Sequence, residues 1–359
     1  MEKSMKQTND FPFLIALVVA GIFVWSGVAD AQEDSIYRIR RSGKVSKVGG
    51  KIVGITATMI KFESRNGAEE IPVWEVEKIV SASEPQQVER ARDRIENGRY
   101  ADALDELDQA KTGGKPLVDA EVAWLRALAN AELALSGGNV TASAAATEMG
   151  NFLGKFKSSH HVIPATAWMG KLGIAAGELD FATKQFSKLS QAKWPEYAAR
   201  GMFQKGETLM MQAKFPEASQ SFDQLIGLAA TDDSTQLYKT LAKIEKAKVE
   251  GMSGNTDAAI QALEQIIDAE NPDNKQLFAY AYNALGSCYM KKNDVPRAVE
   301  KFLFTHVLFD TEADPHAEAV YNLASIWTAQ KKTDRASEYR DLLNSRYRNS
   351  WWASQLTKL

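Results

Sequence analysis

A small residue followed four positions later by a large apolar residue recurs along most of the chain, and this recurrence constrains the fold most strongly. Successive occurrences are 36 to 41 residues apart. A repeat of this length indicates stacked helix pairs, because one pair alone cannot bury its apolar face. We therefore expect a mostly α protein, an α-solenoid of about seven helix pairs over residues 86–359. The residues are Ala103 with Leu107, Ser143 with Thr147, Ala182 with Phe186, Ala218 with Phe222, Ala259 with Leu263, Ala298 with Phe302, and Ala336 with Tyr339 three positions later.

Two of these units carry a more detailed motif. The first reads Tyr282-x-x-Leu285-Gly286-x-x-Tyr289 and continues with Ala298 and Phe302 in the next helix, and the second reads Leu323-Ala324-x-x-Trp327 before Ala336. This pattern resembles the tetratricopeptide repeat, in which small residues let paired helices approach closely. The family repeat has 34 residues, so the longer spacing here predicts extended helices or longer loops. The closing Arg-Tyr-x-Asn-Ser, residues 346–350, is also similar to a segment in repeat proteins of bacterial outer-membrane assembly and cell-division systems.

Residues 33–83 follow a different pattern. Runs rich in β-branched and aromatic residues alternate with glycine pairs, and Asn66-Gly67 separates Ile60 and Phe62 from Ile71 and Val73. Asn-Gly between alternating runs is a strong hairpin signal. Four or five short strands in this length predict a small all-β barrel of the SH3 or Sm type, preceding the repeats.

The N-terminus predicts the compartment. Lys3 and Lys6 precede an apolar run from Phe11 to Val28, and Ala29-Asp30-Ala31 follows. These are the three parts of a signal peptide, so we expect export to the periplasm or cell envelope, with cleavage after Ala31. The alternative is an uncleaved membrane anchor, because about 20 apolar residues span a bilayer.

Residues that could carry chemistry are few. The formal net charge is -3, without the basic excess that nucleic-acid binding requires. His160-His161 is expected to be a solvated loop before Pro164 and not a metal site, because adjacent side chains on a helix or strand point apart. Cys288 is expected to be a buried structural thiol. Acidic residues with lysine partners, such as Glu245 and Lys248, are expected on a solvated face. We predict no cofactor, no metal and no enzymatic activity.

The resemblance to tetratricopeptide repeats implies a binding groove along the first helices of the pairs, for a protein or peptide partner. Asparagine side chains there can hold a peptide backbone through a paired donor and acceptor. Trp351-Trp352 would be either an exposed anchor for a partner or a cap over the last helix. The family's groove positions correspond to Arg200, Phe203, Glu207, Met210, Tyr280, Asn283, Ser287, Met290, Lys291, Glu318, Tyr321, Asn322, Ser325 and Thr328.

Three functions stay open at this point. The leading hypothesis is a non-catalytic scaffold in the bacterial cell envelope that binds a partner protein or peptide along this groove. The second is a structural subunit that self-associates, as a homo-oligomer, in an outer-membrane or cell-wall assembly complex. The third is a hydrolase with a site between the β module and the first repeat, which would need polar residues that converge in a closed pocket there.

Overall fold

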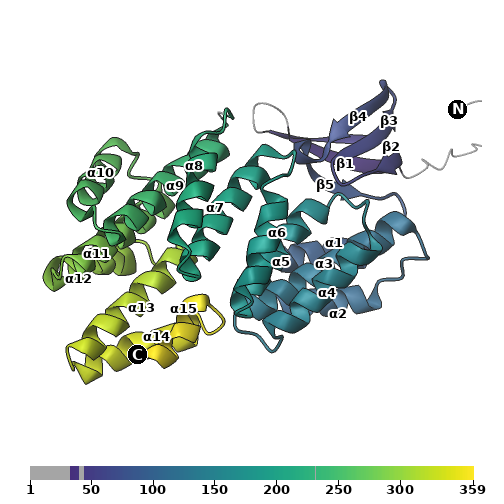
Figure 1. Ribbon diagram of the computed structural model, residues 1–359. Coiled ribbons are helices and arrows are strands. Elements are labelled where there is room, and N and C mark those ends of the chain that lie inside the picture. The colour runs from purple at the N-terminus through teal and green to yellow at the C-terminus, as the bar shows by residue number, and fades with distance from the viewer. Residues whose placement is uncertain (1–32, 40–43, 231) are drawn as a thin grey trace, which may run out of the picture. The chain divides into compact units, whose positions relative to one another are not determined.

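The computed structural model describes residues 33–39, 44–230 and 232–359. The predicted signal peptide, residues 1–31, lies outside the described residues. In the described ranges the chain forms a small antiparallel sheet followed by helices (Figure 1). None of the described helices is both long and apolar enough to cross a lipid bilayer.

The sheet consists of five strands in the order β4-β3-β2-β1-β5. The long strand β2 pairs with β1 along its first half and with β3 along its second half, and a bulge lies between Ile52 and Gly54. A short 3-10 helix, η1, joins β4 to β5. The predicted module of short strands is therefore present as an antiparallel sheet, in which β4 and β5 are the edge strands. The strands are β1 (Asp34–Ile39), β2 (Val45–Ile55), β3 (Met59–Ser64), β4 (Gly67–Pro72) and β5 (Val76–Val80), with η1 at Val73–Glu75.

The core of the sheet contains the apolar residues on either side of Asn66-Gly67 that the alternating sequence pattern indicates. Ile60 pairs directly with Ile71 across β3 and β4, and Phe62 and Val73 are buried with them. The predicted hairpin is present, with Arg65 and Asn66 as its two connecting residues. Within it only the glycine, Gly67, has a positive φ of 112°. The run from Glu70 to Val80 is divided by η1 between β4 and β5.

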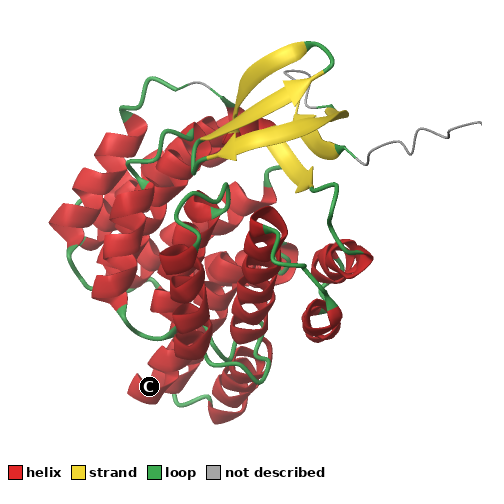
Figure 2. Cartoon of the chain, turned by 90° about the vertical axis from the view of Figure 1, so that its right-hand side faces the viewer, coloured by secondary structure: helices red, strands yellow, loops and turns green. Residues whose placement is uncertain are grey.

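Seven helix pairs follow in the described part of the chain, and each pair packs against the next. The expected solenoid of helix pairs is therefore confirmed. Figure 2 shows the strands gathered at one end of the helices. The pairs are α1 (Gln86–Glu96) with α2 (Tyr100–Gln109), α3 (Pro116–Leu135) with α4 (Ala142–Lys155), α5 (Val162–Ala175) with α6 (Leu179–Leu189), α7 (Pro195–Met211) with α8 (Phe215–Ile226), α9 (Asp233–Met252) with α10 (Thr256–Ala269), α11 (Lys275–Lys291) with α12 (Val295–Leu308), and α13 (Ala313–Ala329) with α14 (Thr333–Arg346); α15 (Trp351–Gln355) and a final 3-10 turn, η2 (Leu356–Lys358), end the chain.

The same turn joins the two helices of all seven pairs. One residue adopts a left-handed backbone conformation, and the amide of the next residue donates a hydrogen bond back to a carbonyl in the last turn of the first helix, as Lys214 does to Leu209 over 2.9 Å. This is the Schellman arrangement, which satisfies carbonyl groups that a helix end leaves free. The left-handed residues are Gly98, Gly137, Gly177, Ala213, Gly254, Asn293 and Lys331.

Close helix contact within the pairs depends on glycine. Gly170, Gly206 and Gly286 face the rings of Phe186, Phe222 and Phe302, all of which are fully buried. A Cβ atom on Gly206 would stand 2.3 Å from the Phe222 ring. The expected role of the small residues in the repeat is thus confirmed for these three pairs.

One unit of the repeat was placed wrongly from sequence. Ser143 and Thr147 are both exposed on α4, whereas Ala145 and Met149 are fully buried. The spacing of four is the same, but the register is shifted by two residues. The cause is the alanine-rich stretch around this point, in which several registers present a small residue.

Candidate functional site

A chamber of about 750 Å³ lies among the first helices of six successive pairs, α3, α5, α7, α9, α11 and α13. Neighbouring first helices contact one another along this series, so their inner faces form a continuous wall. Its volume falls within the range of small-ligand pockets, about 300–1,000 Å³. Methionine, aromatic and carboxyl side chains all line it, and the carboxyl groups distinguish it from the packed core.

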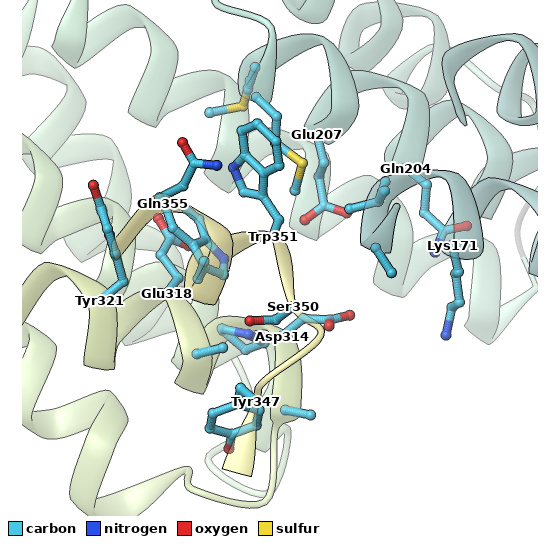
Figure 3. Close-up of a pocket in the computed structure, with 18 of the residues that line it drawn as sticks. Lys171, Gln204, Glu207, Asp314, Glu318, Tyr321, Tyr347, Ser350, Trp351 and Gln355 are labelled. Carbon is cyan, nitrogen blue, oxygen red and sulfur yellow. The ribbon is translucent and has the colours of Figure 1, made fainter. Parts of the chain in front are cut away.

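The C-terminal segment, residues 349–359, forms one side of this chamber. The Asn349 amide donates a hydrogen bond of 2.5 Å to the carbonyl oxygen of Ala134, at the end of α3. Ser350 caps α15 by accepting a hydrogen bond from the amide of Ala353. Trp351 from α15 and Glu207 from α7 reach into the chamber from these different elements (Figure 3).

A network of buried charged groups lines part of the chamber. The Lys248 ammonium lies 2.5 Å from Oε1 of Glu318 and 3.5 Å from Oε2 of Glu245, and all three side chains are less than a tenth exposed. Burial opposes the charge on Lys248, but the carboxylates of Glu245 and Glu318 outweigh it and raise its pKa. Asn283 joins the network by donating to Oε2 of Glu318 over 3.3 Å.

Two carboxyl groups of the chamber have a strongly raised pKa. Burial raises the pKa of Glu245 to about 7, although Lys248 opposes this shift. Burial, and then the nearby carboxyl groups of Glu245 and Asp314, raise the pKa of Glu207 well above its ordinary range. The Tyr280 hydroxyl donates a hydrogen bond of 2.9 Å to Glu207. Perturbed carboxyl groups in a cavity are typical of functional sites.

Comparisons with known proteins address the repeat itself. A family model described as tetratricopeptide repeat matches residues 244–303, which run from α9 to α12. The chain is a tetratricopeptide repeat protein. A crystal structure of a tetratricopeptide repeat protein from Parabacteroides merdae is 19% identical, with a TM-score of 0.54, over 76% of this chain and 96% of that one. The C-terminal part of a repeat-containing protein from Cytophaga hutchinsonii is 14% identical, with a TM-score of 0.41, over 72% and 95%. A search among curated proteins finds no match.

The groove residues predicted for this tetratricopeptide repeat protein divide into two groups. Tyr280, Ser287, Tyr321 and Asn322 line the chamber. Of the further family positions, Glu207, Met210 and Glu318 line it as well. The remaining predicted residues are not among its lining residues; they are Arg200, Phe203, Asn283, Met290, Lys291, Ser325 and Thr328.

The residues outside the chamber are used in packing and local contacts. Phe203 and Asn283 are buried at 2% and 0% exposure, and the Asn283 amide donates to the Pro315 carbonyl oxygen over 2.7 Å. The Arg200 guanidinium lies over the Tyr197 ring. Asn322, which does line the chamber, donates to the Glu318 carbonyl of its own helix. The side-chain amide nitrogens of both asparagines therefore already donate hydrogen bonds within the protein.

Of the two roles that the sequence left open for the adjacent tryptophans of the tetratricopeptide repeat protein, the structure shows the cap. Trp352 packs against Tyr321 of α13, with ring centroids 5.3 Å apart, and so caps the last pair. Both tryptophans also line the chamber.

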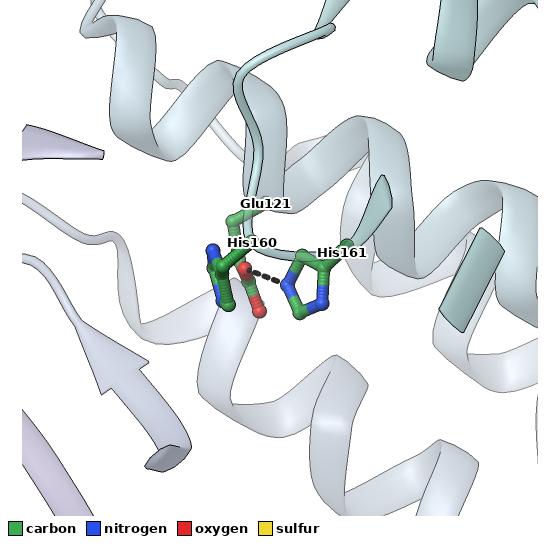
Figure 4. A group of neighbouring side chains, drawn as sticks. All are labelled: Glu121, His160 and His161. Carbon is green, nitrogen blue, oxygen red and sulfur yellow. Dashed lines mark hydrogen bonds and ion pairs between the residues drawn. The ribbon is translucent and has the colours of Figure 1, made fainter. Parts of the chain in front are cut away.

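Two expectations about charged and histidine residues were wrong. Glu245 and Lys248 are not on a solvated face: they are buried and line the chamber. His160 is 8% exposed and not part of a solvated loop, and it lies with His161 beside Glu121 (Figure 4). The two histidines sit in a turn before α5, so the divergence of adjacent side chains on helices and strands does not apply to them.

The Glu121 cluster belongs to an ion-pair network near the junction of the sheet and the first pairs. His161 Nε2 lies 2.8 Å from Glu121, and the Arg92 guanidinium pairs with Glu121 and Glu84. Arg92 also donates to the carbonyl oxygen of Ile79 in β5. Polar residues thus do converge where the hydrolase hypothesis places them, but Arg92 and His161 already hold both Glu121 oxygens. Cys288, as expected, is fully buried, and burial raises the pKa of its thiol to about 11.

The helical spacing of the sequence already indicated that two of the chamber residues, Glu245 and Lys248, lie on a buried helix face. Glu245 and Lys248 lie four and seven positions after Leu241, which is fully buried, so all three share one face of α9. Charged residues on a buried helix face are unusual and indicate a site or a paired network.

Proposed function

We propose that this tetratricopeptide repeat protein is a non-catalytic scaffold of the bacterial cell envelope that binds a segment of a partner protein in the chamber. The observation that carries the proposal is the chamber itself, which six first helices line and the chain's own C-terminal segment borders. Tetratricopeptide domains bind protein or peptide partners, and the wall of first helices is the surface on which a short segment would lie.

The C-terminal segment illustrates what the chamber accepts. A short helix with two aromatic residues packs there, ties itself to α3 through Asn349 and packs Trp352 on α13. Aromatic anchors in concave sites supply most of the affinity of many interfaces. A partner segment of similar character would fit beside α15 in the remaining volume.

The binding proposal is tested by filling the chamber. Residues 32–359 are used as bait in an envelope extract, together with Ser287→Trp, which places a large side chain on α11 at the chamber wall. Ser337→Trp, at an exposed position of α14, is the matched control. We expect a partner that is retained by the wild type and by Ser337→Trp and lost by Ser287→Trp, with unchanged circular dichroism. A partner retained equally by all three proteins would show that binding uses another surface.

Location in the envelope is proposed from the N-terminal sequence, with its basic start, apolar run and Ala29-Asp30-Ala31. Cell fractionation followed by N-terminal sequencing tests it, and the expected mature protein begins at Gln32. Recovery of the full-length chain in the cytosolic fraction would contradict the proposal. Recovery of the full-length chain in membranes would support the uncleaved anchor instead.

A further inference from the structure

The side chains around the chamber are strongly unbalanced in charge. Five carboxyl groups line it against two ammonium groups, those of Lys171 and Lys248. Lys248 is committed to Glu245 and Glu318, as described above. Burial lowers the pKa of the Lys171 ammonium, because the charged form loses solvation there. The carboxyl groups are those of Glu132, Glu207, Glu245, Asp314 and Glu318.

Two side chains that line the chamber carry acceptor oxygens without donors. The Glu245 side chain is only 3% exposed, and its Oε1 atom has no hydrogen-bond partner among the described residues. Oε1 of Gln204, one turn away from Glu207 on α7, is in the same condition. A buried acceptor without a donor costs about 1–3 kcal/mol. A ligand that donates hydrogen bonds would remove this cost once the side chain rotates its oxygen toward the chamber, because each oxygen exposes less than 1 Å² where it lies.

The aromatic side chains that line the chamber also favour a cation. Trp168, Tyr321 and Trp351 line the chamber, and aromatic faces attract ammonium and guanidinium groups. Two of these rings already attract lysines of the chain itself: the Lys171 ammonium lies 5.2 Å from the centre of the Trp168 ring, and the Lys358 ammonium lies 5.7 Å from that of Trp351. An anionic ligand would instead meet five carboxyl groups and a single ammonium group outside the Lys248 network, so a carboxylate terminus does not fit.

We propose that the chamber receives a basic side chain, lysine or arginine, of the bound partner segment. The inference rests on the proposed function and names the chemistry of its ligand. The carboxyl groups of Glu207 and Glu245 are the acceptors for that side chain, with Oε1 of Gln204 beside them. The aliphatic part of a lysine or arginine would pack against the methionines of α7, Met210 and Met211, which line the same wall.

Proton release accompanies this binding. The raised pKa of Glu207 and Glu245 means that protons occupy these carboxyl groups at moderately acidic pH, and a cation would displace them. The groups that face them are Lys248 on α9, Tyr280 on α11, Asp314 and Glu318 on α13, and more distantly Lys171 on α5. The affinity for a basic side chain should therefore increase as the pH rises through 7.

The test compares two isosteric probes, Nα-acetyl-arginine amide and Nα-acetyl-citrulline amide, which differ in charge but hardly in shape. Binding is followed through the indole N–H signals of uniformly ¹⁵N-labelled protein, with Trp351→Phe to assign the signal in the chamber. We expect the Trp351 signal to shift with the arginine probe and the citrulline probe to bind at least about tenfold more weakly, a difference of roughly 1.4 kcal/mol. Equal binding of the two probes, or no shift with either, would overturn the inference.

Two chamber variants and one control make the test specific. Glu245→Gln and Glu207→Gln should each reduce binding of the arginine probe about tenfold or more. In Glu207→Gln the new amide oxygen would still accept the hydrogen bond from the Tyr280 hydroxyl, so the fold is kept. Asp180→Asn removes the same charge at an exposed position of α6 and should leave binding unchanged. If a partner segment is lost with Ser287→Trp while arginine and citrulline bind alike, the proposed function stands and this inference fails.

Discussion

The side-chain amide of Asn349 donates a hydrogen bond to the backbone carbonyl oxygen of Ala134, across 215 positions of sequence. This bond joins the last described segment to the end of α3, in the second helix pair. It ties the C-terminal segment to the far side of the chamber. The stability of that side of the chamber should therefore depend on one side chain.

Replacing Asn349 by alanine should loosen the C-terminal segment. A hydrogen bond of this kind contributes about 1 kcal/mol, and the main contacts of α15 with other helices are those to α13 and α14. Hydrogen exchange measured by mass spectrometry should show faster exchange in residues 349–359 and unchanged exchange in α9 and α11. Asn344→Ala, at an exposed position of α14, is the control. Unchanged exchange in the segment would mean that the contact adds nothing.

Replacing Ala213 by glycine should stabilise the protein. Ala213 has a φ of 58°, a conformation that costs an L-residue about 1–2 kcal/mol and costs glycine almost nothing. After the greater freedom of glycine in the unfolded chain is counted, we expect a net gain of roughly 0.5–1 kcal/mol. Denaturant unfolding measures it. Asn293→Gly should gain less, because asparagine tolerates this conformation better. A loss of stability in Ala213→Gly would contradict the role given to these turns.

Replacing Gly206 by alanine should destabilise the fourth helix pair. The added Cβ would lie 2.3 Å from the Phe222 ring, which is fully buried and has no room to move. Overpacking of this kind costs about 1–3 kcal/mol. The same substitution at Gly154 meets no atom within 4 Å and should stabilise α4 by up to about 1 kcal/mol. Thermal melts of the two variants should therefore shift in opposite directions, and equal shifts would refute the contact.

The pH dependence of stability should change in Glu245→Gln. The pKa of Glu245 is about 7 in the folded state and about 4.3 in an unfolded chain, so the folded state binds more protons between these values. Its contribution is complete below about pH 4 and is lost as the pH rises through 7, by on the order of 1–3 kcal/mol. Denaturant unfolding at pH 5 and pH 8 should show a smaller loss in the variant than in the wild type. Parallel losses would show that this carboxyl group does not titrate in that range.

Much of the fold was predictable because the same pattern of small and large apolar residues recurs in several helix pairs. Ala298 with Phe302 and Gly286 with Tyr289 obey steric rules that depend on neighbouring helices alone. Pro216 and Pro296 fall in the first turn of their helices, where a missing N–H group leaves no hydrogen bond unmade. The register of α4 failed where alanines repeat and no single position is distinguished.

The chamber was harder to predict because it depends on contacts between distant units. Glu245 and Lys248 look like an ordinary surface pair until Glu318, seventy positions after Lys248, is placed beside them. The role of Asn283 was also misjudged, because its partner is the backbone of Pro315 in the next pair. The positions of the His160 and His161 side chains depend on the backbone geometry of a turn, which the identity of the two residues does not determine.

The core of the sheet has a consequence for how the protein can be divided. Leu117 of α3 and Trp194, which precedes α7, pack against the sheet core, and Trp194 also packs against the core of α5 and α6. A fragment that began at residue 86 would expose both side chains and leave Arg92 without Glu84. Sheet and repeats should therefore melt as one cooperative transition, and the sheet acts as the end cap that keeps the first helix pairs from fraying.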